Sequence, residues 1–424
     1  MRAAGLVLEK ILLKEFLFRN EAGTFVPAYL YDKIKKGCEL MKTETEQQGL
    51  PWLPLMVMLG LVLLAIISEL LPSGLLVQMG DDLGVDYGTV SYLVGGYALP
   101  AGLLAIPMTQ VVTKFDRRPL LLVLTCGFAL SNFLVFLAPN FPLAFMGRLI
   151  GGASAGTFWS MLGPYAMDMV SSENRGKAGT IALAGSPIGI SLGLPLWTRL
   201  GQVAGWRIAF LATALAFAVL GILAWRILPS IPGQASDSRI KPTDVLKKPG
   251  FRVAILVVFL MVMAEYSVYV YIQLISDRLG LALQSSQIFF GVGALLAVWI
   301  VARLIDSHLK HLMQGALLAG AIAMFVFLAL SGHPVLGLGA MVLWGMSFGP
   351  ISSLLQNSVI RQVDKGHDVA MSIQTTVFDL SIMGASVMGA SLYQGLGLAA
   401  NLLIAMLLFL VAALVVTVFR QYYK

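Results

Sequence analysis

The feature that most restricts the fold of this chain is a series of twelve apolar runs, each long enough to cross a lipid bilayer. A helix needs about 20 apolar residues to span the hydrocarbon core, and only helices and closed barrels satisfy every backbone hydrogen bond there. The runs lie at residues 53–78, 87–112, 119–138, 141–168, 178–199, 206–228, 252–275, 285–304, 312–331, 334–357, 368–393 and 397–419. Charged residues make up only 12% of the chain, against about 25% in soluble domains. The sequence therefore predicts an all-α membrane protein with twelve transmembrane helices.

The polar segments between the runs divide the chain into five regions. We expect a cytoplasmic N-terminal extension at 1–50, a six-helix bundle at 51–228, a cytoplasmic inter-half loop at 229–250, a second six-helix bundle at 251–419 and a cytoplasmic tail at 420–424. The extension contains no run of spanning length. An amphipathic helix on the membrane surface and a translation start at Met41 are both open interpretations of it.

The positions of the basic residues predict the orientation in the membrane. With the N-terminus in the cytoplasm, 25 of the 29 Lys and Arg residues fall in cytoplasmic segments or at adjoining helix ends. The others are Arg148, Arg199, Arg207 and Arg278. Cytoplasmic loops are enriched in Lys and Arg, and an even number of spans brings both termini to the cytoplasmic side. The net charge of +7 is thereby explained without a nucleic-acid partner, and membrane lipid, protons and a small solute are the expected partners.

A weak internal repeat relates the two halves of the chain. Glu69 in the first run and Glu265 in the seventh are 196 residues apart. Gly189 in the fifth run and Gly384 in the eleventh are 195 residues apart. Near-constant separations of this kind predict two homologous six-helix halves, the architecture of transporters built from parallel repeats.

Glu69 is the leading candidate for a residue with a role in mechanism. It lies inside the first apolar run, three residues before Pro72. A carboxylate at the centre of a transmembrane helix costs about 2.5 kcal/mol or more, and lipid cannot replace the backbone hydrogen bond that proline removes. We therefore predict that Glu69 faces a watered interior and exchanges a proton. Arg148, at similar depth in the fourth run, is expected to pair with Glu69, either as a fixed ion pair or in competition with proton and solute.

Two further carboxylates, Glu265 and Asp379, fall near the middle of the seventh and eleventh runs. They are candidates for binding a cationic or polyhydroxylated solute or for a second proton site, and the alternative is that they are protonated and hydrogen-bonded. Aromatic and amide side chains predicted to line the same pocket are Trp159, Tyr266, Tyr269, Tyr271, Gln356, Gln374 and Phe378. Aromatic faces flanked by hydrogen-bonding groups suit sugars and purines, although Tyr and Trp also gather at membrane interfaces.

The sequence offers little for enzymatic chemistry. It contains no HExxH or P-loop motif, and its four histidines and two cysteines form no cluster. We therefore expect no enzyme activity, no metal and no cofactor, which also argues against an ATP-driven pump. A secondary transporter is the favoured hypothesis, and a membrane enzyme or a non-transporting sensor or channel is the alternative.

Several segments match the patterns of a known transporter family. The first run and the loop after it read Ser68-Glu-Leu-Leu-Pro-Ser-Gly-Leu-Leu76 and Asp82-Leu-Gly-Val85. The fourth run contains Arg148-Leu-Ile-Gly-Gly-Ala-Ser-Ala-Gly156, and the tenth contains Leu343-Trp-Gly-Met-Ser-Phe-Gly349. Over residues 52–419 the chain thus resembles the major facilitator superfamily. Within it, the chain is most similar to the bacterial drug:proton antiporter group, which includes arabinose-efflux-like, sugar-efflux and purine-nucleoside-efflux permeases.

This resemblance implies both a fold and a function. The fold would be two pseudo-twofold-related six-helix bundles in the bacterial inner membrane, acting as a monomer without a cofactor. The function would be proton-coupled export of a small organic solute (a sugar, nucleoside or drug) by alternating access, with uptake by proton symport as the alternative. The resembling permeases tend to have His or a neutral residue at the position of Glu265 and Asn at that of Asp379, so both carboxylates are departures.

The gating motifs of the family are only partly present. The loop after the second run keeps the basic residues of the pattern G-x-L-A-D-R-x-G-R-R but has Asp116 at the second glycine. The fifth run has the glycines and prolines of the antiporter motif in a different order, so ordinary helix packing is the alternative to gating there. The resemblance assigns gating to Lys114, Asp116, Arg117, Arg118, Asp306, Lys310, Gly185, Pro187 and Gly189. Gate salt bridges are expected from the helix-end carboxylates Asp168 and Asp306 to the basic residues near them, Arg175, Lys177 and Lys310.

Overall fold

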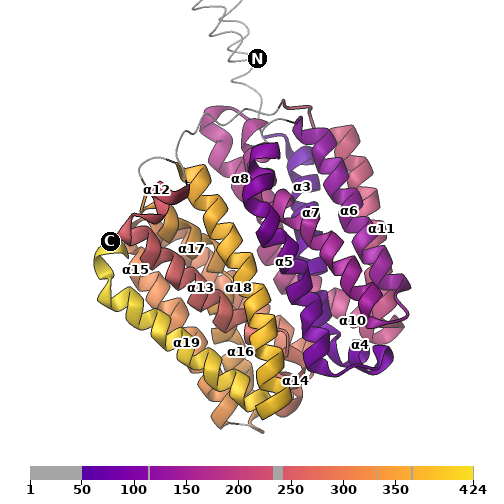
Figure 1. The fold of residues 1–424 in the computed structure, drawn as a ribbon, viewed down its shortest axis with the longest axis vertical. Coiled ribbons are helices and arrows are strands. Elements are labelled where there is room, and N and C mark those ends of the chain that lie inside the picture. Colours follow the sequence, from indigo (N-terminus) through magenta and orange to yellow (C-terminus); the bar gives the residue numbers. More distant parts are fainter. Residues whose placement is uncertain (1–49, 113–114, 233–241, 331, 364–365, 424) are drawn as a thin grey trace, which may run out of the picture.

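The computed structural model describes residues 50–112, 115–232, 242–330, 332–363 and 366–423, which form two helical bundles (Figure 1). The first bundle contains α3 (Trp52–Gly74), α4 (Leu76–Leu83), α5 (Tyr87–Val112), α6 (Arg117–Leu137), α7 (Phe141–Asp168), η2 (Ser172–Asn174), α8 (Arg175–Leu183), α9 (Gly185–Ile188), η3 (Gly189–Gly193), α10 (Leu194–Ala204) and α11 (Trp206–Ile227). The connecting helix α12 (Pro242–Leu246) leads to α13 (Pro249–Tyr269), α14 (Ile272–Arg278), α15 (Leu283–Ala329), α16 (Pro334–Phe348), α17 (Ile351–Ile360), α18 (His367–Leu396), α19 (Leu398–Val418) and η4 (Arg420–Tyr423). The all-α prediction is confirmed for the described residues.

Ten helical segments of the described chain are long and apolar enough to cross a membrane. The predicted fourth run forms α7, a 28-residue helix that is not among those ten. The helix α15 covers the predicted eighth run and the ninth run as far as Ala329, and only His308 (φ −133°, ψ 27°) departs from helical geometry within it. The loop expected between these two runs is therefore a kink in one 47-residue helix. Residues 1–49 and 233–241, parts of the predicted extension and loop, lie outside the described residues.

The first and seventh spans are broken at equivalent positions. Leu75 (φ −123°, ψ 17°) separates α3 from α4, and Tyr271 (φ −99°, ψ 18°) immediately precedes α14. These two residues are 196 positions apart, the same separation as Glu69 and Glu265. The backbone thus follows the repeat that the sequence indicated, and it interrupts one helix in each bundle.

Glycines bring helices into close contact at equivalent places in the two bundles. A Cβ on Gly152 of α7 would lie 1.8 Å from the backbone oxygen of Tyr97 in α5. A Cβ on Gly345 of α16 would lie 1.9 Å from the backbone oxygen of Phe290 in α15. Only glycine permits such an approach of two backbones. The spacing of 193 residues between these glycines again relates the halves.

Gly152 also begins the stretch Gly-Ala-Ser-Ala-Gly156, which has the G-x-S-x-G spelling of a serine-hydrolase nucleophile elbow. That elbow requires a sharp turn between a strand and a helix. Here the stretch lies inside α7, and the Ser154 hydroxyl donates to the backbone oxygen of Ile150 at 3.3 Å. The two glycines of this stretch therefore serve helix packing, and the stretch does not form a nucleophile elbow.

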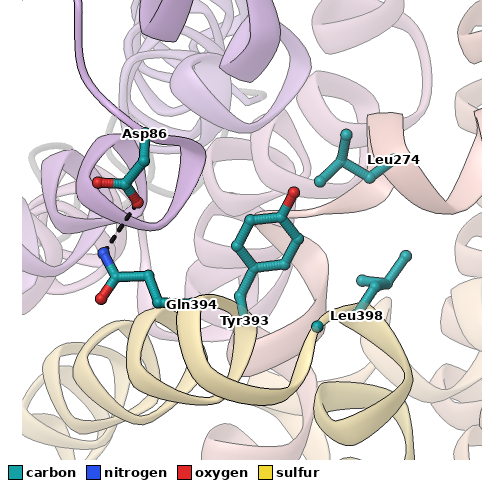
Figure 2. A pocket seen from close by; sticks show the side chains of 6 residues that line it. Asp86, Leu274, Tyr393, Gln394 and Leu398 are labelled. Carbon is teal, nitrogen blue, oxygen red and sulfur yellow. Dashed lines mark hydrogen bonds between the residues drawn. The ribbon is translucent and has the colours of Figure 1, made fainter.

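For orientation within the molecule, we call the end that contains Asp116, Asp168 and Ser230 the linker end, and the opposite end the far end. α5 of the first bundle packs along α18 of the second (Figure 1). At the far end, Gln394 of α18 donates to Asp86 at 2.8 Å. Around this contact lies an open pocket of about 570 Å³ (Figure 2), whose walls come from both bundles. Its lining residues are Asp86, Leu274, Tyr393, Gln394, Gly397 and Leu398.

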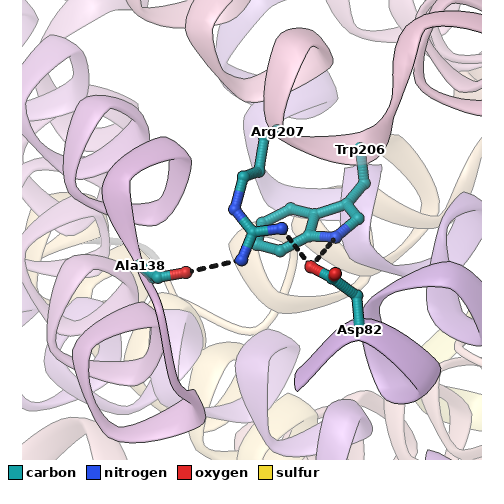
Figure 3. Close-up of polar contacts among 4 residues, drawn as sticks. All are labelled: Asp82, Ala138, Trp206 and Arg207. Carbon is teal, nitrogen blue, oxygen red and sulfur yellow. Dashed lines mark hydrogen bonds and ion pairs between the residues drawn. The ribbon is translucent and has the colours of Figure 1, made fainter. Parts of the chain in front are cut away.

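Three far-end segments of the first bundle are joined by one ionic cluster (Figure 3). The Asp82 carboxylate accepts a hydrogen bond from the Trp206 indole N–H at 3.0 Å and pairs with the Arg207 guanidinium. Arg207 also donates to the backbone oxygen of Ala138 at 2.9 Å and lies over the Trp206 ring, 4.2 Å from its centroid. The hydrogen bonds from Arg207 and Trp206 hold the pKa of Asp82 below its ordinary value of 3.8.

We predict that Asp82→Asn lowers thermal stability at neutral pH by about 1 kcal/mol or less, because Asp82 is partly exposed and its ion pair is screened by solvent. A carboxyl whose pKa is lower in the folded state stabilises the fold above its unfolded-state pKa, and this contribution disappears as pH falls through the folded-state pKa. The deficit of the variant should therefore shrink below about pH 4. Thermal unfolding of detergent-solubilised protein from pH 3 to pH 8 measures this.

The matched control is Asp81→Asn, since Asp81 carries the same charge one position away and, among the described residues, its carboxylate accepts only from the Tyr87 hydroxyl. A deficit for Asp82→Asn that is unchanged down to pH 3, or equal to that of the control, would contradict the ionic role of the cluster.

Candidate functional site

Glu69 lies at the interface between the two bundles. Its side chain is 8% exposed, and the hydroxyl of Tyr266, on α13 of the other bundle, donates to Oε1 at 3.3 Å. The Tyr266 ring packs in turn against Phe348 and Phe378, at centroid distances of 5.3 and 6.1 Å. A carboxylate of one bundle and a phenol of the other therefore meet at a buried position of the interface.

Asp379 of α18 belongs to the same interface. A Cβ on Gly102 of α5 would lie 3.0 Å from the Asp379 Cβ, so the two helices touch at this level. The Oδ2 atom of Asp379 is buried and accepts no hydrogen bond from the described part of the chain. Glu69 and Asp379 are close enough to interact electrostatically. Two carboxylates from opposite bundles in a low dielectric repel each other, so a proton or a cationic group between them is favoured.

Arg148 of α7 is fully buried beside Glu69 but does not pair with its carboxylate. Nη1 donates to the backbone oxygen of Ser68 at 2.6 Å, Nη2 to that of Glu69 at 2.9 Å, and Nε to that of Leu93 at 2.8 Å. The guanidinium also lies 4.3 Å from the centroid of the Tyr97 ring. The predicted proximity is present, but the expected ion pair is replaced by contacts to backbone, because all three nitrogens are directed at carbonyl oxygens.

Glu265, the repeat partner of Glu69, points into its own bundle. It is 0% exposed, and α16 supplies both of its hydrogen-bond donors: the Trp344 indole at 2.7 Å and the Ser347 hydroxyl at 2.6 Å. Tyr269, one turn further along α13, packs on the same Trp344 at a centroid distance of 5.7 Å. Glu265 and Tyr269 are thus enclosed within the second bundle, and the solute-binding roles proposed for them stay predictions.

The other predicted solute-binding residues are spread over several levels of the molecule. Tyr266 and Phe378 lie together beside Glu69, and Phe378 is half-buried. Trp159 is half-buried and packs edge-on against Phe158. Tyr271 stacks on Tyr393 at 5.0 Å near the far-end pocket. Two amides complete the set: Gln374 is buried, with Oε1 unbonded among the described residues, and Gln356 is exposed on α17.

A second line of inter-bundle contacts was not predicted from the sequence. Between α10 and α15, Gln287 donates to the Thr198 hydroxyl at 3.2 Å. In the π-helical turn η3, Ser191 donates to the backbone oxygen of Gly291 at 3.0 Å. A π-turn inside a helix is rare and frequent at functional sites. The glycine cluster of the fifth run was the available signal, but it does not specify which side chain the turn directs toward the other bundle.

The predicted glycine motif itself packs inside the first bundle. A Cβ on Gly185 would lie 2.1 Å from the backbone oxygen of Leu59, and one on Gly189 would lie 2.4 Å from Ile66. Both contacts are with α3, and the intervening Pro187 is half-buried. These contacts are those of close helix packing, and a gating role for the motif stays a prediction.

At the linker end, the predicted gate residues form a charged cluster. Asp168 pairs with Arg117 at 2.8 Å and with the expected partner Arg175 at 3.5 Å. Asp116 caps the N-terminus of α6 by accepting from the backbone N–H of Arg118 at 2.9 Å. The connection between the bundles contacts the same cluster through two hydrogen bonds. The Ser230 hydroxyl donates to Asp116, and the Arg117 N–H donates to the backbone oxygen of Ile231 at 3.0 Å.

The corresponding cluster of the second bundle is built differently. Arg361 donates to the backbone oxygens of Ile305 and Asp306, at 2.9 and 3.0 Å. The described side chains include no ion pair between Asp306 and Lys310, so that predicted salt bridge is absent. Lys114 lies outside the described residues.

Comparison with known proteins agrees with this architecture. The family model described as Major Facilitator Superfamily matches residues 57–386. The purine ribonucleoside efflux pump NepI of Escherichia coli is 28% identical over 364 residues, covering 83% of this chain and 90% of the pump. The NepI protein of Shigella dysenteriae serotype 1 is also 28% identical, over 368 residues, with the same coverage.

Solved structures show the same fold at low sequence identity. The human organic anion transporter MFSD10 has a TM-score of 0.67 at 18% identity, covering 87% of this chain and 100% of that one. The xylose transporter XylE of E. coli, in a partially occluded inward-open conformation, has a TM-score of 0.67 at 15% identity, with coverages of 88% and 98%. With its two helical bundles, broken first and seventh spans and matching family model, this chain belongs to the major facilitator superfamily of membrane transporters.

Proposed function

We propose that this transporter exports a nucleoside-like solute across the bacterial inner membrane in exchange for protons. The single observation that carries the proposal is the hydrogen bond that Tyr266 of one bundle donates to Glu69 of the other, at an interface where Asp379 of α18 also packs against α5. The named efflux relatives support a purine ribonucleoside as the solute class. We further propose that the protein acts as a monomer.

The chemistry of the interface supports exchange of solute for proton. A carboxyl group in an apolar site favours its neutral form unless a donor or cation compensates the charge. Protonation of Glu69 or Asp379 removes the repulsion between them, and so does a bound solute that offers hydroxyl or amino donors to the same oxygens. Because proton and solute compete for one pair of carboxylates, the site carries one or the other, which is the requirement for antiport.

The position of the pair between the bundles couples this competition to conformation. Glu69 belongs to the first bundle, whereas Tyr266 and Asp379 belong to the second. Rocking of the two bundles about a fixed central site is the usual route of alternating access in such repeats. Movement at this level must break the hydrogen bond between Tyr266 and Glu69, so occupancy of the carboxylates biases which side is open.

The basic linker end supports an orientation with that end in the cytoplasm. Arg117, Arg118 and Arg175 lie there, and cytoplasmic loops carry the excess of basic residues. With both termini on that side, the far-end pocket around Asp86 faces the outside.

We predict that Glu69→Gln lowers the initial rate of pH-gradient-driven purine ribonucleoside flux in proteoliposomes by about 100-fold, a typical loss for a proton-transferring group. Glutamine keeps the acceptor for the Tyr266 hydroxyl but cannot release a proton. The exposed linker-end change Glu173→Gln is the control, with equal reconstitution checked by gel filtration. Full gradient-dependent flux in Glu69→Gln would remove this residue from the coupling mechanism.

We predict that Asp379→Asn weakens the pH dependence of ribonucleoside binding and alters which solutes compete. In the wild type, acidification should weaken binding by close to tenfold per pH unit where proton and solute compete for one site. In the variant this slope should fall by half or more. Glu265→Gln is the matched comparison, since Glu265 is enclosed by Trp344 and Ser347 away from the interface.

Binding measured by tryptophan quenching or scintillation proximity from pH 5.5 to pH 8.5 gives these slopes. Identical slopes and competition profiles for the wild type and Asp379→Asn would assign Asp379 a structural role only.

A further inference from the structure

The helix that carries Glu69 lacks one backbone hydrogen bond, and no N–H of the regular helix can replace it. In an α-helix, the N–H of each residue donates to the carbonyl four positions earlier. Pro72 lies inside α3 and has no N–H, so the carbonyl of Ser68 loses its helical donor. Ser68 is 0% exposed, and an unpaired backbone carbonyl in such a place is costly.

Arg148 supplies the missing donor from a different helix. Its Nη1 atom lies 2.6 Å from the Ser68 oxygen, the shortest of its three hydrogen bonds. Its Nη2 atom donates to the next carbonyl, that of Glu69, at 2.9 Å. The two nitrogens of one planar guanidinium therefore hold two consecutive peptide oxygens of α3, at the residue whose side chain faces the other bundle.

The third nitrogen of the guanidinium and one of its faces also make contacts. Nε donates to the Leu93 oxygen of α5 at 2.8 Å, and the ring of Tyr97 covers one face. The Ser68 side chain is fixed separately by Asn132 of α6, whose amide donates to the hydroxyl at 2.9 Å. At the level of Glu69, polar contacts thus connect helix α3 to α5, α6 and α7, and three of the five N–H donors of Arg148 are directed at backbone oxygens rather than at the Glu69 carboxylate.

We propose that Arg148 is a positioning residue that replaces the backbone donor removed by Pro72 and thereby directs Glu69 toward Tyr266 across the interface. The geometry of the fork, rather than its charge, carries this role. A lysine, which has one nitrogen, cannot hold both peptide oxygens and Leu93 together. Proline in the first span and arginine in the fourth are accordingly one structural unit. The consequence for proton exchange depends on the proposed function, whereas the pairing of Pro72 with Arg148 does not.

A double-mutant cycle tests the pairing independently of transport. Pro72→Ala restores the N–H that can donate to Ser68, so it should make the protein less dependent on Arg148. We expect Arg148→Gln to lower the melting temperature strongly in the wild-type background and by less than half as much in the Pro72→Ala background, because contacting residues show non-additive effects. If Arg148→Gln alone does not fold, recovery of folded protein in the double variant is the expected result.

The positioning role is tested by transport. Arg148→Lys keeps the charge and should still shift the pH midpoint of ribonucleoside flux and reduce its rate by about tenfold, a loss typical of one charge-assisted hydrogen bond. Pro72→Ala/Arg148→Lys, which restores the backbone N–H and keeps the positive charge beside Glu69, should return the midpoint to the wild-type value. Additive melting temperatures in the cycle, or no folded protein in the double variant, would overturn the pairing. Full rescue of flux by Arg148→Lys alone would overturn the positioning role.

The two proposals fail separately. If Glu69→Gln retains coupled transport while the Pro72–Arg148 cycle remains non-additive, the proposed coupling role is lost and the structural unit stands. If the cycle is additive while Glu69→Gln abolishes coupling, Glu69 acts without this support.

Discussion

The cost of a carboxylate inside hydrocarbon determines how the centre of this protein is arranged. Glu69, Glu265 and Asp379 all lie within apolar helices, and each must find donors, a proton or water. Glu265 finds two donors inside its own bundle. The Glu69 carboxylate has Arg148 of its own bundle nearby but accepts its hydrogen bond from Tyr266 of the other bundle, and Oδ2 of Asp379 accepts none from the described residues. Glu265 is therefore fixed within one bundle, whereas the surroundings of Glu69 and Asp379 depend on the relative position of the two bundles.

The two halves share two backbone features, a broken first helix and close helix contacts at glycine, but differ in the side chains around them. Both break the first helix of their repeat, at Leu75 and before Ile272, and both use glycine to press neighbouring helices together. Only the first half places a proline just before the break. It therefore needs an outside donor for the freed carbonyl, and a buried guanidinium in that half meets the need. The asymmetry gives the backbone at Glu69 a guanidinium contact from Arg148, whereas at Glu265 the side chain itself is held by Trp344 and Ser347.

Most of the architecture can be predicted from the sequence, because the thickness of the bilayer sets the length of each apolar run. The constant spacing between residues such as Glu69 and Glu265 also indicates the repeat. Arg148 was also identified, but its true partners were not, since no pattern states that a guanidinium will meet backbone carbonyls rather than a carboxylate. The contacts of Gln394 with Asp86 and of Gln287 with Thr198 were missed for a related reason. They depend on the rotation of whole helices about their axes, which side-chain packing decides. The kink at His308 could not be predicted either, because the residues of a helix kink and those of a short polar loop are alike in composition.

In the proposed mechanism, the two bundles move relative to each other when the occupancy of the Glu69–Asp379 site changes. The most direct measurement is the distance between spin labels on opposite bundles, one pair at the exposed far-end positions Ala204 and Ala282 and one at the exposed linker-end positions Glu173 and Ser307. As pH and ribonucleoside concentration are varied, we expect the two distances to change in opposite directions, with the far-end distance lengthening in conditions where the linker-end distance shortens. Distributions that stay constant for both pairs, in protein that is active in transport, would contradict it.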